Sequence, residues 1–96
     1  MYVLNVSYSQ SPIKVEPYIS AHSAWVRQHL DEGTFLFAGR KKSGSGGVIL
    51  VKSIPQQELQ TLLSKDSYTQ AEVATYQILE FDCRLTGPTL KALAGT

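Results

Sequence analysis

The sequence predicts an α+β fold, in which a four-stranded antiparallel sheet carries two helices on one face in the ferredoxin-like order βαββαβ. Two observations support this order. Four segments are short, apolar and rich in β-branched and aromatic residues, as strands are, and two longer segments repeat apolar residues every three or four positions, as helices do. The chain has 96 residues, 43% of them hydrophobic, which suits one domain with a modest core.

The first half of the chain supplies the first three elements. Residues 2–8 alternate apolar and polar side chains and predict a strand, followed by a polar loop at 9–17 with two prolines. Residues 18–32 predict a helix that ends at Gly33, a residue able to adopt positive φ. Its apolar face carries two histidines, and its members are Tyr18, Ile19, His22, Trp25, Val26, His29 and Leu30.

The remaining elements follow in order. Strands are expected at 34–39 and 47–52, joined by a flexible glycine-rich connection at 40–47. Ser53 and Gln56 have capping-box spacing and predict a helix at 53–65. A last strand is expected at 73–83. Residues 1–83 therefore form the expected domain, and residues 84–96 a tail that the pattern does not place.

The strands predict a homodimer, because apolar residues occupy both of their sides. Phe35 and Phe37 alternate with Leu36 and Ala38. Apolar residues also occupy both sides of the strands expected at 47–52 and 73–83. Helices cover only one face of such a sheet, so the other apolar face needs a cover. The same face of a second copy would supply it and would form a dimeric α/β barrel.

Composition excludes several classes of protein. A net charge of +1 lacks the basic excess of nucleic-acid-binding proteins. One cysteine forms no internal disulfide, and no apolar run approaches the length of a membrane span. The N-terminal apolar run follows no basic region and reads as a strand, so no signal peptide is expected. These features predict a cytoplasmic protein without nucleic-acid or membrane partners.

The candidate chemical residues each have a structural alternative. His22 and His29 are seven positions apart, which does not match the spacing of a helical metal site, so no metal is expected and either could be an ordinary half-buried helix residue. Asp66 suits a turn at a helix end. If its carboxylate faced the imidazole of His22, however, the imidazole would become a general base. The cationic loop starting at Arg40 resembles a solvated hairpin tip, and Cys83 a small apolar residue at a strand end.

Three segments in this order resemble the YciI-like family of dimeric α/β barrels. They are the strand MYVLNVSY, the segment HSAWVRQHLDEGTFLFAG, in which His22 precedes Gly33 by eleven positions, and the segment KDSYTQAEVATYQILEF, which resembles the family's Asp-Pro-Tyr motif at Asp66 and Tyr68. The resemblance covers roughly residues 1–83. It implies a sheet-to-sheet dimer and a cleft with a histidine–aspartate pair, here His22 and Asp66.

The chain departs from the family pattern at three positions. Ile19 stands where an arginine is common, Arg40 replaces a proline after Ala-Gly, and Ser67 replaces the proline of Asp-Pro-Tyr. A substrate shared with other members is therefore not implied, although Arg40 could restore a positive charge near the cleft.

The leading hypothesis is an enzyme that uses His22 and Asp66 for proton transfer or elimination on a small cyclic or aromatic substrate, without metal or organic cofactor. Trp25, Phe37 and Tyr68 are candidate apolar walls of the site, with Arg40 nearby. One alternative is a non-catalytic dimeric barrel that binds a small ligand or serves as an accessory subunit. Another is an interaction module that uses the loop at 40–47.

Overall fold

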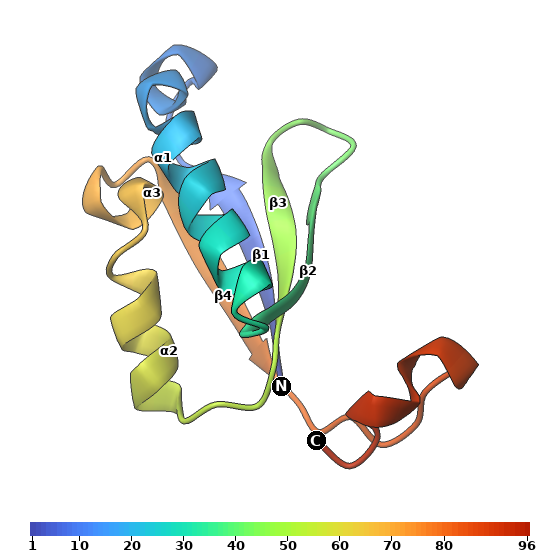
Figure 1. The fold of residues 1–96 in the computed structure, drawn as a ribbon. Helices are drawn as coiled ribbons and strands as arrows, with labels where there is room; N and C mark the ends of the chain where they lie inside the picture. Colours follow the sequence, from blue (N-terminus) through green and yellow to red (C-terminus); the bar gives the residue numbers. More distant parts are fainter.

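A computed structural model describes residues 1–96 and confirms the predicted α+β fold. The elements in chain order are β1 (Tyr2–Tyr8), α1 (Pro12–Asp31), β2 (Phe35–Arg40), β3 (Gly46–Val51), α2 (Gln56–Leu63), α3 (Ser67–Gln70), β4 (Ala74–Glu80) and the 3-10 helix η1 (Pro88–Leu93). The sheet order is β2-β3-β1-β4, and every neighbouring pair is antiparallel. Figure 1 shows the helices α1, α2 and α3 on one face of this sheet.

The core lies between the sheet and these three helices. Alternation along β1 buries one side of the strand, as expected from the sequence, and the helices cover it with apolar side chains. The cluster comprises Tyr2, Leu4, Val6, Val15, Trp25, Phe35, Ile49, Val51, Leu59, Leu62, Leu63, Tyr68 and Val73. No helix of the chain is both long and apolar enough to cross a membrane.

Helix α1 begins at Pro12, six residues earlier than predicted. Pro12 occupies the first turn, where a missing backbone N–H costs nothing because the first N–H groups of a helix have no partner within it. Pro17 lies inside the helix without ending it, and the extra turns are mostly exposed. The two prolines, which suggested a loop, therefore belong to a longer helix.

The predicted capping box of α2 is wrong. The helix begins at Gln56 after Pro55, and no side chain caps it. Ser53 has another task, because its Oγ accepts a hydrogen bond from the N-terminal amine of Met1 at 3.0 Å and donates one to the Thr96 carbonyl at 2.9 Å. The serine thus ties the two ends of the chain together, and Figure 1 shows these ends close to each other.

The connection between β2 and β3 is shorter than expected. Arg40 belongs to β2 and Gly46 to β3, so only residues 41–45 lie outside the strands. The tip is closed by backbone hydrogen bonds from Lys41 to Gly46 and from Gly44 to Lys41. Gly46 is required here, because it has φ of +146° and a Cβ at this position would lie 1.9 Å from the carbonyl oxygen of Val6.

A β-bulge in β2 changes which residues share a face. Phe35 pairs with Val51 but Phe37 pairs with Leu50, so one additional residue lies between them. Phe35 is therefore buried in the core, whereas Phe37 lies on the outer face and is 52% exposed. The expectation that both phenylalanines lie on the same side of the strand is wrong.

The C-terminal segment leaves the sandwich. Strand β4 ends at Glu80, three residues before its predicted end, so Cys83 lies in an irregular segment. The 3-10 helix η1 follows at Pro88–Leu93 and contributes no buried residue. Figure 1 shows it extending away from the sheet and the helices.

Candidate functional site

The structure brings His22 of α1 to Asp66, which lies 44 residues away in sequence. Nδ1 of His22 lies 2.7 Å from Oδ1 of Asp66. Asp66 is fully buried, and the His22 side chain is 15% exposed. Since a carboxylate only accepts hydrogen bonds, Nδ1 is the donor, and in the neutral ring the lone pair then lies on Nε2. Nε2 makes no hydrogen bond within the chain, so it can act as a base.

Asp66 is held by two further donors. Its side chain caps α3 by accepting from the backbone N–H of Tyr68 at 3.3 Å, and its Oδ2 accepts a short hydrogen bond from the Tyr76 hydroxyl. The turn role and the histidine contact are therefore compatible. Three donors satisfy the buried carboxylate and fix its plane, which in turn fixes the imidazole.

The short helix α3 holds the other side of the imidazole. The rings of Tyr68 and His22 are stacked, with centroids 3.8 Å apart and planes 6° from parallel. Ser67 Oγ donates to the carbonyl of Tyr18, one turn before His22 on α1. The carboxylate and the stacked ring hold the imidazole from two sides and favour one orientation of it.

Two tyrosine hydroxyls of the site have raised pKa values. Burial raises the pKa of Tyr76 above its usual range, and the hydrogen bond to Asp66 adds to this effect. Burial also raises the pKa of Tyr68, supported by Tyr8 and Asp66, while the positive charge of Arg40 opposes the rise. Both hydroxyls stay protonated at neutral pH, so Tyr76 remains a donor to Asp66.

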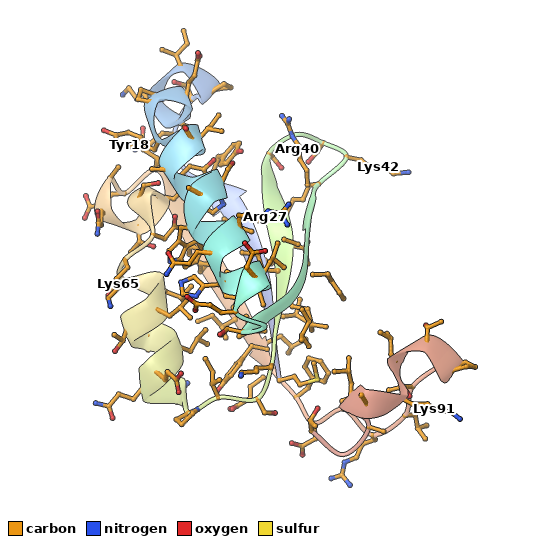
Figure 2. All side chains as sticks on the ribbon, in the orientation of Figure 1. Tyr18, Arg27, Arg40, Lys42, Lys65 and Lys91 are labelled. Carbon is orange, nitrogen blue, oxygen red and sulfur yellow. The ribbon has the colours of Figure 1, made fainter.

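A pocket of about 350 Å³ opens beside His22. Helix α1 forms one wall and strands β1, β2 and β3 form the other, with Tyr68 at one end. Figure 2 shows Arg27 on α1 where the helix faces the β2–β3 hairpin that carries Arg40. The lining residues are Val6, Tyr8, Ile19, His22, Ser23, Val26, Arg27, Leu30, Ala38, Gly39, Arg40, Gly46, Gly47, Ile49 and Tyr68.

The predicted site residues divide into two groups. His22, Arg40 and Tyr68 line the pocket, and Asp66 lies directly behind His22. Trp25 does not line it, because its ring packs in the core against Phe35 at a centroid distance of 5.2 Å. Phe37 lies on the outer face of the sheet, where the bulge places it.

His29 lies outside the pocket, in the last turn of α1. Its ring packs against Trp25 and Phe35, and its Nδ1 is 3.3 Å from a carboxylate oxygen of Glu32. Its side chain is 15% exposed, the same fraction as that of His22. The two histidines thus share burial and a nearby carboxylate, and they differ in access to the pocket.

Sequence reasoning missed Tyr76 and the wall residues Tyr8, Ser23 and Arg27. Tyr76 is one residue in a strand, and only its pairing opposite Val6 places its hydroxyl under Asp66. Ser23 follows His22 by one position and Arg27 follows Ser23 by four along α1, so helical spacing from Ser23 was the signal that could have found Arg27. No group of three or more histidine, cysteine or acidic side chains could hold a metal ion.

These features define an α+β sandwich with a histidine–aspartate pair at the wall of a small pocket between the helix and the hairpin. Residues 1–82 match the YCII-related domain, and the chain belongs to this family. A search of curated protein sequences found no match.

A solved structure with a similar fold is 5-chloro-2-hydroxyhydroquinone dehydrochlorinase from Burkholderia phenoliruptrix AC1100, in complex with 2,5-dihydroxybenzoquinone. The TM-score is 0.64 and the sequence identity 14%, over 86% of this chain and 95% of that one. At this identity the similarity concerns the fold.

Proposed function

We propose that the chain is an enzyme that moves a proton on a small cyclic or aromatic substrate, with His22 as the base and Asp66 as the residue that orients it. The observation that carries the proposal is the His22–Asp66 contact at 2.7 Å beside an open pocket. A histidine needed only for packing has no requirement for a fully buried carboxylate held by three donors. Such an arrangement sets the tautomer of the imidazole and the orientation of its ring.

The chemistry follows from the position of Nε2. This nitrogen accepts a proton from an acidic O–H or C–H of a substrate in the pocket, and the electron pair of that bond forms a C=O or C=C bond. Where the substrate carries a leaving group such as chloride, its bond to carbon breaks and the group departs as an anion. Loss of a proton and a halide is redox-neutral, so the proposed reaction uses no redox cofactor. The related dehydrochlorinase makes chlorinated hydroxyhydroquinones suitable first substrates.

The test compares two histidines that differ in access to the pocket. Chloride release from 5-chloro-2-hydroxyhydroquinone and deuterium exchange into 2,5-dihydroxybenzoquinone would be measured for the wild type, His22→Asn and His29→Asn. We expect His22→Asn to lose on the order of 10²–10⁴-fold in rate. His29→Asn should lose little, because His29 has the same exposure but does not line the pocket.

Two results would speak against the proposal. Full activity in His22→Asn would show that His22 is not the base. Binding of these compounds by the wild type without turnover or exchange would favour the alternative, a non-catalytic ligand-binding member of the family.

We also propose that two copies pair through the outer face of the sheet. The register aligns one apolar row across all four strands, Phe37–Leu50–Val3–Leu79, of which Phe37 and Leu79 are 52% and 64% exposed. The next row is Gly39–Val48–Asn5–Gln77, in which Asn5 donates a hydrogen bond to Gln77 at 2.9 Å. The support for a dimer is therefore this single row rather than a wholly apolar face.

A further inference from the structure

We propose that the substrate carries an oxyanion on its ring, a carboxylate or an ionised hydroxyl, and that Arg40 is the residue that recognises it. This inference rests on the proposed function and names the substrate class of the same pocket.

The pocket lining is cationic. Of its 15 residues none is aspartate or glutamate, whereas Arg27, Arg40 and the titratable His22 are present. The only acidic group at the site, Asp66, is fully buried behind the imidazole. For a chain with a net charge of +1, two arginines in one small pocket are a local concentration of positive charge. A neutral or cationic ligand gains nothing from this field, whereas an anion does.

Of the two arginines, Arg40 is the one without an ion-pair partner in the chain. No carboxylate of the chain lies within ion-pair distance of it, whereas Arg27 lies 4.0 Å from Asp31 on the same helix. A guanidinium offers five donors in a planar fork that matches the two oxygens of a carboxylate. Arg40 can therefore bind an anion without breaking an existing ion pair.

The strand geometry places Arg40 on the wall of the pocket opposite α1. In β2 the residues Ala38 and Arg40 share a face, and Ala38 pairs with the buried Ile49, so this face is the one under α1. Arg40 and His22 therefore belong to opposite walls. Both residues line the same pocket, and the positive charge of Arg40 lowers the pKa of Tyr68, whose ring stacks on His22.

This placement gives Arg40 a role in the chemistry as well as in binding. When His22 removes a proton, negative charge develops on the substrate, and a cation on the opposite wall stabilises it. A pocket of about 350 Å³ suits one substituted six-membered ring between the two groups. The anion sets the orientation of the ring, so that the acidic hydrogen faces Nε2.

The experiment is a calorimetric binding titration with a matched pair of probes. 4-Hydroxybenzoate and 4-hydroxybenzamide share a ring and a hydroxyl and differ in one negative charge. A third probe, 2,5-dihydroxybenzoquinone, carries readily ionised ring hydroxyls and no carboxylate, so it separates the two sources of the oxyanion. The variants are Arg40→Gln and the control Lys42→Gln, which removes an equal charge two residues away. Figure 2 shows Lys42 at the hairpin tip, pointing away from α1.

We expect the wild type to bind at least one anionic probe more tightly than the amide. Arg40→Gln should weaken that binding about 10- to 100-fold, the usual contribution of charge-assisted hydrogen bonds, and leave the amide unaffected. Lys42→Gln should change it by less than about twofold, as expected for an exposed charge. The anionic probe whose binding is weakened more by Arg40→Gln identifies the kind of oxyanion that Arg40 recognises.

Three outcomes would overturn the inference: equal binding of acid and amide, equal losses in Arg40→Gln and Lys42→Gln, or no binding of either anion at millimolar concentration. Different results would refute the proposed function. His22→Asn keeps the guanidinium, so it should retain the preference for the anion even if it shows that His22 is not the base. Conversely, turnover that requires His22 but not Arg40 would leave the function in place and remove the anion site.

Discussion

The hydrogen bond from Tyr76 to Asp66 can be tested by a substitution that removes one oxygen. In Tyr76→Phe the ring remains and the buried Oδ2 of Asp66 loses its donor. Hydrogen bonds to charged groups contribute about 1.5–3 kcal/mol each, and no other donor contacts this oxygen. For a chain of this size each 1 kcal/mol corresponds to about 4–8 °C in Tm, so Tyr76→Phe should melt roughly 6 to 24 °C lower.

The same tyrosine predicts the response of stability to alkaline pH. In the folded chain the pKa of Tyr76 is raised, whereas in the unfolded chain it has its ordinary value of about 10. Between these values only the unfolded chain loses the proton, so ionisation favours unfolding. This contribution to stability is fully present below about pH 10 and is lost as the pH rises toward the folded pKa, by about 1.4 kcal/mol per pH unit.

The assay is urea denaturation at fixed protein concentration between neutral pH and the limit of reversibility above pH 10. Tyr76→Phe should be less stable than the wild type at neutral pH and should show a shallower alkaline slope, reduced by about 1.4 kcal/mol per pH unit. The control is Tyr18→Phe, because the Tyr18 side chain is 38% exposed and its hydroxyl makes no hydrogen bond within the chain. Equal stability and an equal slope in Tyr76→Phe and the wild type would refute the reasoning.

Two further predictions concern the histidine and the sheet. Asp66→Asn places an amide beside Nδ1 of His22, so the amide can donate to the ring and move its proton to Nε2; the ¹⁵N shifts of His22 should report this tautomer, and activity should fall on the order of 10²–10⁴-fold. An unchanged tautomer with full activity would contradict the orienting role of Asp66. Leu79→Glu should convert a dimer into monomers in sedimentation, because it places a charge in the apolar row, whereas Leu85→Glu, at a residue 91% exposed outside the sheet, should leave the dimer intact. A wild type that sediments as a monomer at micromolar concentration would remove the proposed interface.

The sequence by itself determined the type and order of the main elements, because periodicity is a local property. Alternation along residues 2–8 and the spacing of apolar residues along α1 are visible without any partner segment. The same spacing places His22 on the inner face of its helix. Element ends were less accurate, because Pro12 and Pro17 suggest a loop by composition and are tolerated in the exposed first turns of α1.

The tertiary structure decided which side chains meet. His22 and Asp66 are 44 residues apart, and the hypothesis that pairs them came from the family resemblance, whereas their distance depends on how α3 packs on α1. Tyr76 reaches Asp66 through the pairing of β4 with β1, and Phe37 leaves the pocket side through one additional residue in β2. A single-residue shift in register reverses the face of every side chain that follows, and no local pattern in the sequence reports it. Strand pairing and helix packing therefore decide which residues line the pocket.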